Sequence, residues 1–388
     1  MALPPSKSVA NRALILAALA GDLECVTGFG TADDTRILHQ LLLERPEEMH
    51  CGDGGTTFRF LLAWACVQEG KEHLITGNQR LLERPHAPLV NALRELGADI
   101  TIEATGLRVR GRKMRGGHIR IHSPESSQFI SALLLVAPCF TNGLDLQWTG
   151  LRLSEPYARM TLDLLRKFGA QAMDNGDALH VASGALKARD IHVPPDWSAA
   201  AFWFEVAALE PEAQLVLKGL SCSGMQGDEA LLSLFLPYTY YALLDEVVML
   251  RGRSGADLAF YHADLLDTPD LFQPLAFALA GLGRKAAFTG LHNLSLKETD
   301  RLKAVSEALN VLGSAAEYED GAFKLQGEIT NITPPPFDPQ GDHRMAMSLA
   351  PLALVCDAIT ILHPDVVNKS YPGFWEQLKH AGFSVEFS

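Results

Sequence analysis

The stretch LVNALRELGA at residues 89–98 sets the pattern from which the fold follows. Its apolar residues recur at the spacing of one helix face, Gly97 suits a helix C-cap, and the residues after it alternate as in a half-buried strand. Three more copies of this pattern end at Gly169, Gly313 and Gly382. Gly97 and Gly169 lie 72 residues apart, and Gly313 and Gly382 lie 69 residues apart. The spacing predicts repeated α/β units of about seventy residues.

The longer interval between the two middle glycines predicts a degenerate copy of the unit. Residues 228–236 supply a helix-like run, but Pro237 replaces the glycine, and another degenerate copy is expected near residues 37–43. Because 388 residues exceed what one core serves, five to six units divided between two domains are expected. Pro194 and Pro195 mark the expected hinge. The alternative is that leucine-rich helices ending in glycine are simply common.

Composition excludes several classes of protein. With 47% hydrophobic and 20% charged residues the chain is typical globular material, and it has no apolar run of membrane-spanning length. No signal peptide opens it, so we expect a cytoplasmic protein without membrane association. A net charge of -13 argues against nucleic acid but allows small anions, if the basic residues gather in one place. The six cysteines include no close pair and are expected to be reduced and mostly buried.

The segment PPSKSVANR at residues 4–12 precedes a strongly helix-forming run. Its two prolines disfavour an earlier helix, so the N-cap is expected at or near Ser6 or Ser8. Backbone N–H groups at that helix start, together with Lys7 and Arg12, would suit a phosphate or carboxylate. The alternative is an ordinary capped helix with two surface cations.

Three more segments have the chemistry of anion sites. The glycine-rich turn CGDGGTTFR at residues 51–59 lets a ligand approach the backbone at Gly55, since glycine has no Cβ. Residues 126–128, Ser-Ser-Gln, and residues 154–157, Ser-Glu-Pro-Tyr, each precede or open a helix and either cap it or bind an anion. Arg84, next to a proline, is either a ligand or a solvated charge.

Two later clusters are more specific. In NLSLKETDR at residues 293–301, Lys297 and Arg301 are four residues apart, so a helix would place both cations on one face beside Glu298. DHRMAM at residues 342–347 is expected to begin another helix with a carboxylate, an imidazole and a guanidinium. Lys369 adds a cation before a further helix. For each cluster the alternative is a buried ion-pair network.

In this order, SKSVANR, GDGGTTFR, ERP, SSQF, SEPY, LKETDR, DHRMAM and NKSYPGF make the chain resemble the 5-enolpyruvylshikimate-3-phosphate synthase family of enolpyruvyl transferases. The resemblance runs from Pro4 to the C-terminus. It implies an α/β fold, a two-domain inside-out α/β barrel of βαβαββ units with about three units per domain. One domain would span residues 5–194 and the other residues 1–4 with 195–388, with the active site in the cleft between them.

The reaction that the resemblance implies moves the enolpyruvyl group of phosphoenolpyruvate to the 5-hydroxyl of shikimate 3-phosphate and releases phosphate. It belongs to aromatic amino acid biosynthesis, needs no metal or other cofactor, and would have these two small molecules as partners of a monomeric protein. Asp270 would be the base, with Asp267 as a fallback, and Glu298 the proton donor, with Lys297 or Lys7 assisting. The implied phosphoenolpyruvate ligands are Lys7, Gly55, Arg84, Gln128, Arg301, Arg344 and Lys369. The implied shikimate 3-phosphate ligands are Lys7, Ser8, Arg12, Ser126, Ser127, Gln128, Ser154, Tyr157, Asp270, Asn293 and Lys297.

The sequence departs from the family pattern at several places. The strand that normally precedes the Ser-Lys-Ser motif is expected to be missing, and Glu155, Asp53 and Pro5 replace the usual Lys, Asn and Gly. One alternative is the related transferase that acts on UDP-N-acetylglucosamine, but Ser8 follows Lys7 where that enzyme usually has Asn. A non-catalytic paralogue that binds anions is the other alternative, which the complete set Lys7, Asp270, Lys297 and Glu298 disfavours.

Overall fold

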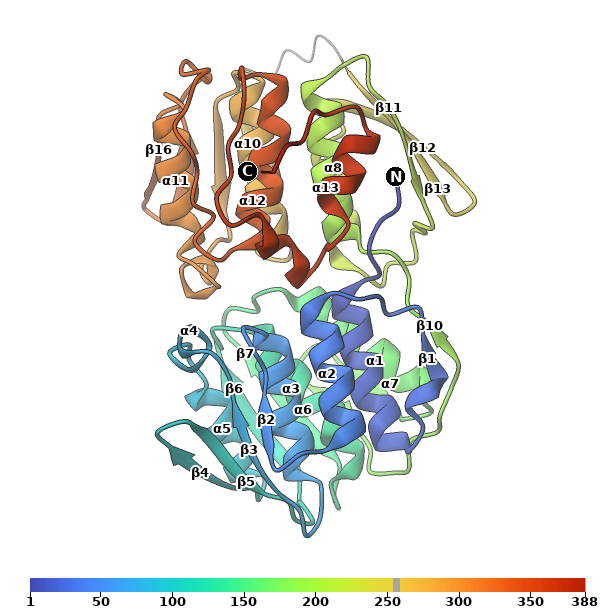
Figure 1. Cartoon of the computed structure of the whole chain (residues 1–388). Coiled ribbons are helices and arrows are strands. Elements are labelled where there is room, and N and C mark those ends of the chain that lie inside the picture. Colours follow the sequence, from blue (N-terminus) through green and yellow to red (C-terminus); the bar gives the residue numbers. More distant parts are fainter. Residues whose placement is uncertain (254–258, 388) are drawn as a thin grey trace. The chain divides into compact units, whose positions relative to one another are not determined.

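The computed structural model describes residues 1–253 and 259–387. The chain forms two compact α/β units (Figure 1). The amino-terminal unit is Pro5–Val193, and the carboxy-terminal unit is Met1–Pro4 with Pro194–Ser388. Within the described part of the chain, no helix has both the length and the apolar character needed to cross a membrane.

Three four-stranded sheets share one topology, in which the first two strands are parallel and the last two pair antiparallel. Two belong to the amino-terminal unit, with orders β2-β3-β5-β4 and β6-β7-β9-β8, and the third is β14-β15-β17-β16 of the carboxy-terminal unit. Their bounds are β2 (Glu48–His50), β3 (Glu72–Thr76), β4 (Asp99–Glu103), β5 (Gly106–Arg110), β6 (Gly117–His122), β7 (Leu144–Thr149), β8 (Ala172–Asp174), β9 (Leu179–Val181), β14 (Tyr261–Asp264), β15 (Ala286–Thr289), β16 (Ala316–Glu319) and β17 (Ala322–Leu325).

Two smaller sheets complete the strands. The carboxy-terminal unit has an antiparallel sheet of order β11-β13-β12, and the amino-terminal unit has a short parallel pair, β1 with β10. These strands are β1 (Val26–Thr27), β10 (Ile191–His192), β11 (Gln214–Lys218), β12 (Thr239–Leu244) and β13 (Val247–Gly252). The degenerate copy predicted at residues 228–236 contains only the short helices η3 (Gly227–Ala230) and α9 (Leu231–Leu234).

Helices that are apolar on nearly all sides form the core of each unit. In the amino-terminal unit α1 and α6 pack against α3, and in the carboxy-terminal unit α8 and α12 pack against α10 (Figure 1). The α-helices are α1 (Lys7–Ala20), α2 (Asp33–Glu44), α3 (Gly55–Cys66), α4 (Gln79–Leu82), α5 (Ala87–Glu95), α6 (Ser127–Val136), α7 (Glu155–Lys167), α8 (Trp197–Leu209), α10 (Phe272–Gly281), α11 (Arg301–Val311), α12 (His343–Leu349) and α13 (Phe374–His380). The remaining 3-10 helices are η1 (Leu23–Cys25), η2 (Ala137–Cys139), η4 (Pro269–Leu271), η5 (Leu294–Leu296), η6 (Ala350–Leu354) and η7 (Pro364–Lys369).

The predicted helix ends are confirmed. Gly97, Gly169, Gly313 and Gly382 all have positive φ, between 76° and 112°, a conformation that favours glycine after a helix. The N-cap of α1 is Ser6, one of the two expected residues, although its side chain makes no capping hydrogen bond. The cysteines are free, and four of the six are buried, whereas Cys139 and Cys222 are exposed.

The prediction of one helix carrying both Lys297 and Arg301 is wrong. The helix η5 ends at Leu296, Lys297 is extended, and α11 begins only at Arg301. The reason is the N-cap of α11, where the Asp300 side chain accepts a hydrogen bond from the backbone N–H of Lys303. Arg301 therefore turns toward other partners than Lys297.

Candidate active site

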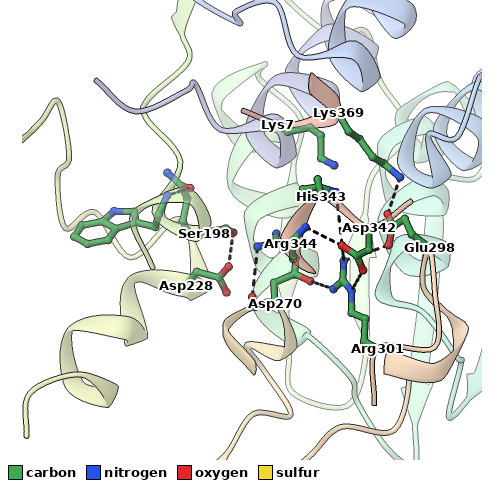
Figure 2. A network of polar contacts seen from close by, with 12 residues as sticks. Lys7, Ser198, Asp228, Asp270, Glu298, Arg301, Asp342, His343, Arg344 and Lys369 are labelled. Carbon is green, nitrogen blue, oxygen red and sulfur yellow. Dashed lines mark hydrogen bonds and ion pairs between the residues drawn. The ribbon is translucent and has the colours of Figure 1, made fainter. Parts of the chain in front are cut away.

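Arg301 lies at the centre of a buried cluster of charges in the carboxy-terminal unit (Figure 2). Its Nε donates to Asp342 Oδ2 at 2.6 Å, its Nη1 to Asp270 Oδ1 at 2.9 Å, and its Nη2 to Glu298 Oε2 at 3.2 Å. Only 2% of its side chain is exposed. One guanidinium thus joins three carboxylates that come from different parts of the chain.

Two further cations extend this cluster. Arg344 donates from Nη2 to Asp270 Oδ2 at 2.8 Å, and Lys369 donates from Nζ to Glu298 Oε1 at 2.9 Å. Asp342 is the N-cap of α12 and accepts from the backbone N–H of Arg344 at 2.9 Å, which confirms the helix predicted at residues 342–347. Because the same carboxylate also binds Arg301, Asp342 fixes the start of α12 against α11.

The charges of the cluster stabilise one another. Burial alone would raise the pKa of Asp270, but the positive charges of Arg344, Lys297 and Arg301 lower that pKa well below its usual range. Burial would likewise lower the pKa of Arg301, but Asp342, Glu298 and Asp270 together raise it. Asp270 and Arg301 are therefore both ionised near neutral pH. An anionic ligand could replace the carboxylates as the hydrogen-bond acceptor of these cations.

The other candidates in this unit differ in their burial. Asn293 is buried and is the N-cap of η5, and its Oδ1 has no hydrogen-bond partner among the described residues. A buried amide oxygen without a partner is costly, so it is suited to a ligand hydroxyl. Lys297 is half-buried near Asp270, whereas Asp267, the fallback for the base, is exposed.

Arg12 is a buried cation in the amino-terminal unit. Its Nε donates to Thr161 Oγ1 at 2.8 Å, its Nη2 to Ser131 Oγ at 2.9 Å, and its Nη1 to the Ser8 carbonyl at 2.8 Å. It forms no ion pair with any residue that the structure describes. Burial lowers the pKa of Arg12 to about 10, against the opposing effect of Tyr157, so the side chain stays charged at neutral pH. A buried charge without a counter-ion favours an anionic ligand.

A second basic group surrounds Gly55, the first residue of α3. A Cβ built at Gly55 would lie 2.7 Å from Arg84 Nη1 and 2.8 Å from Arg59 Nη1, so any larger residue would displace these guanidiniums. Arg59 Nη1 in turn donates to Gln128 Oε1 at 2.6 Å. Burial, then the charges of Arg59 and Arg84, lower the pKa of His86 to about 4, against a hydrogen bond to the Leu81 carbonyl. These guanidiniums thus form a positive region beside the backbone of Gly55.

The remaining candidates of the amino-terminal unit lie at helix starts. Lys7 Nζ donates to Asp34 Oδ2 at 2.9 Å. Ser126 caps α6 by accepting from the Gln128 backbone N–H at 3.2 Å, and Ser127 is buried in the first turn of that helix. Ser154, the N-cap of α7, is buried with φ of 54° and makes no capping hydrogen bond. Its hydroxyl is therefore not used to hold the helix.

Four charged residues of these clusters are not among the predicted catalytic or binding residues. Asp34 and Asp342 pair with Lys7 and Arg301, and Arg59 lies beside Gly55. Arg59 could have been found, because it is one helical turn after Gly55 in the glycine-rich motif. Asp228 could not have been found, because it belongs to no motif and is related to the site by its electrostatic interaction with Asp270.

The structure therefore brings the predicted residues together within each unit. In the carboxy-terminal unit, Asp270 is joined to Arg301 and Arg344, and Glu298 is joined to Arg301 and Lys369. In the amino-terminal unit they form three groups, around Arg12, Gly55 and Lys7. Both units present positive charge, and among the candidate groups just described the carboxy-terminal cluster is the one in which several carboxylates surround a guanidinium.

Comparison with known proteins places this arrangement in a family. A sequence model of EPSP synthase (3-phosphoshikimate 1-carboxyvinyltransferase) matches residues 38–378. A 3-phosphoshikimate 1-carboxyvinyltransferase of Bacteroides fragilis is 38% identical over 391 residues, covering 99% of this chain and 95% of the relative. One of Methanospirillum hungatei is 33% identical, covering 97% of this chain and 94% of the relative. A solved EPSP synthase from Acinetobacter baumannii, only 21% identical, has the same fold, with a TM-score of 0.76 over 100% of this chain and 96% of that one.

Proposed function

Because this chain belongs to the EPSP synthase family, we propose that the cluster around Arg301 and the groups around Arg12, Gly55 and Lys7 serve the reaction of that family. The enzyme transfers the enolpyruvyl group of phosphoenolpyruvate to the 5-hydroxyl of shikimate 3-phosphate, releasing phosphate, in aromatic amino acid biosynthesis. The observation that supports the proposal best is the Asp270 carboxylate held between Arg301 and Arg344. This arrangement places a base among cations that can hold an anionic substrate.

We assign phosphoenolpyruvate to the cations that pair with Asp270 and Glu298, and to the positive region around Gly55. Arg344 would exchange its ion pair with Asp270 for an ion pair with the substrate. The other proposed ligands are the cations Lys7, Arg84, Arg301 and Lys369, the backbone at Gly55 and the side-chain amide of Gln128. Charge-assisted hydrogen bonds from guanidiniums are the strongest that a protein can offer to such an anion.

Shikimate 3-phosphate carries a phosphate, a carboxylate and hydroxyls, and its proposed ligands supply matching groups. The buried Arg12, which has no ion pair among the described residues, supports an anionic group there. Asn293, whose buried Oδ1 has no partner among those residues, would accept a hydrogen bond from a hydroxyl. The full proposed set is Lys7, Ser8, Arg12, Ser126, Ser127, Gln128, Ser154, Tyr157, Asp270, Asn293 and Lys297.

The proposed chemistry uses two carboxyl groups. Asp270 takes the proton of the 5-hydroxyl as its oxygen attacks the enol carbon of phosphoenolpyruvate, and Glu298 gives a proton to the methylene carbon. The resulting adduct then loses phosphate, and its methyl group returns a proton to the Glu298 carboxylate as the enol ether forms. The positive charges of Arg344, Lys297 and Arg301 lower the pKa of Asp270 and make it a weak base. Binding of an anion to Arg344 would free the carboxylate and make it more basic.

Replacement of Asp270 by asparagine tests this assignment. We expect Asp270→Asn to lower kcat by about 10²-fold or more, because the amide cannot accept the hydroxyl proton. Phosphate release from phosphoenolpyruvate in the presence of shikimate 3-phosphate measures the effect. The matched variant is Asp267→Asn at an exposed position, which should keep most of the activity. If Asp267→Asn instead causes the loss, the base is Asp267.

Gly55→Ala tests the positive region beside Gly55. The added Cβ would push the Arg84 and Arg59 guanidiniums, which are flexible side-chain ends, so the fold should survive. We expect KM for phosphoenolpyruvate to rise by about tenfold, since displaced guanidiniums lose part of their contact with the anion. Gly184→Ala is the control, because nothing lies within 4 Å of a Cβ there. An unchanged KM for Gly55→Ala would remove Gly55 from the proposed ligands.

Several predictions from the resemblance accompany this proposal. The domain boundaries, residues 5–194 and residues 1–4 with 195–388, stay predictions, as does an inside-out barrel of about three βαβαββ units per domain. So do a monomeric state, a cytoplasmic location and a reaction without a metal or other cofactor. Analytical ultracentrifugation and activity after dialysis against a chelator test the monomer and the independence from metal.

A further inference from the structure

A second buried carboxyl group, that of Asp228, lies near Asp270 (Figure 2). Asp228 belongs to η3, and only 2% of it is exposed. Its Oδ2 accepts a hydrogen bond from the hydroxyl of Ser198 on α8, and its Oδ1 has no hydrogen-bond partner among the described residues. An ionised carboxylate that is buried with one oxygen unpartnered is unfavourable, whereas the protonated acid is tolerated.

The charges that face Asp228 come from several elements. Burial has the largest effect on its pKa, followed by the negative charge of Asp270, and both raise it. Arg344 and the Ser198 hydroxyl lower the pKa, and Asp196, the N-cap of α8, raises it. The result is a pKa of about 7, so the group is partly protonated near neutral pH. Asp228 therefore responds to changes in charge at both Asp270 and Arg344.

We propose that Asp228 is a positioning residue, which binds a proton when an anionic substrate occupies Arg344 and so keeps the buried charge of the site constant. This inference rests on the proposed function, because it takes Arg344 as a ligand of phosphoenolpyruvate. Asp228 acts through Arg344 and Asp270 and needs no contact with the substrate. Neither the glycine-rich motif nor the clusters of lysine and arginine in the sequence point to it.

The physical reason is the low polarity around the group. When an anion neutralises Arg344, the positive charge that favours ionised Asp228 is lost, so Asp228 takes up a proton from solvent. When Asp270 later accepts the substrate proton, its repulsion of Asp228 ends, and ionised Asp228 becomes less costly. One proton held at Asp228 thus limits the build-up of negative charge around the bound substrate.

The pH dependence of kcat/KM for phosphoenolpyruvate tests the inference. In the wild-type protein this ratio should fall as pH rises above 7, because Asp228 must first regain its proton. Asp228→Asn mimics the protonated acid and should lack that fall. The kcat/KM of Asp228→Asn divided by that of the wild type should therefore rise by up to about fivefold between pH 7 and pH 8. Ionisation of the substrate affects both proteins equally and cancels in this ratio. A ratio that is constant with pH would overturn the proposal.

Thermal unfolding gives a measurement that does not depend on turnover. Because folding raises the pKa of Asp228 above its ordinary value of 3.8, ionisation in the unfolded chain costs stability as pH rises toward 7. Asp228→Asn should therefore melt at a higher temperature relative to wild type at pH 8 than at pH 4. A difference in Tm that is the same at both values would indicate a role in packing alone and contradict the proposal.

Two more variants complete the experiment. Ser198→Ala removes a hydrogen bond that lowers the pKa of Asp228, so the fall in kcat/KM should move to higher pH, and this tests the proposal even if Asp228→Asn does not fold. Glu205→Gln changes another buried carboxyl group, in α8, and should leave the pH profile of the wild type. If Asp270→Asn remains active while Asp228→Asn shows no fall in kcat/KM above pH 7, only the assignment of Asp270 as the base is wrong. If Ser198→Ala leaves the profile unmoved, the proposal for Asp228 fails.

Discussion

Lys297→Met is expected to abolish turnover, with kcat lower by about 10³-fold or more, while the protein stays folded. Methionine keeps the length of the apolar stem but removes the charge. Lys297 is half-buried, and its charge is one of the three that lower the pKa of Asp270. It therefore acts where the proposed reaction develops negative charge, and the loss of a preorganised cation there raises the barrier directly.

Activity and folding of Lys297→Met must be measured separately. Phosphate release gives kcat, and circular dichroism with a thermal melt gives the folded fraction. The matched control is Lys303→Met, two residues into α11, where the lysine is 72% exposed and pairs with Glu307. It should keep wild-type kcat, since exposed ion pairs contribute little. If Lys297→Met unfolds at room temperature with unchanged activity per folded molecule, Lys297 belongs to a structural ion pair.

The repeated helix ends could be predicted because they depend on local chemistry. Gly97 and Gly169 follow amphipathic helices and adopt the positive φ that favours glycine. The spacing of such glycines in the sequence therefore reveals the structural repeat. The same reasoning failed at Lys297 and Arg301, because it used only the spacing of charges. The cap at Asp300 starts a new helix at Arg301, and the spacing of charges alone does not reveal such a helix start.

The site could be predicted only as far as its motifs reach. Arg344 and Glu298 stand in recognisable segments, and the structure brings their side chains into one cluster with Arg301. Apart from Glu298 and Arg301, which are three positions apart, which carboxylate binds which cation could not be predicted, because those pairs join residues that are 31 to 74 positions apart in the chain. Asp228 was missed for the same reason, since its role depends on burial and on Asp270.

Arg301→Met should have the largest effect on stability. Its removal leaves Asp342, which is fully buried, and the carboxylates of Asp270 and Glu298 without their shared counter-charge. Breaking a buried ion pair by removing one partner typically costs about 3–5 kcal/mol, because the remaining charge stays buried and uncompensated. We therefore expect the unfolding free energy of the carboxy-terminal unit to fall by at least about 3 kcal/mol, measured by urea unfolding at pH 7.

The pH dependence of that loss separates charge from packing. Folding lowers the pKa of Asp270, so its ion pairs stabilise the protein above the ordinary value of 3.8 and lose this effect as pH falls through the lower folded value. The difference between Arg301→Met and wild type should therefore shrink in acid. Lys303→Met removes an exposed pair with Glu307 in the same unit and should cost less than about 1 kcal/mol at any pH. A loss for Arg301→Met that is equally small, or that does not change with pH, would mean that the cluster is held together by packing rather than by its charges.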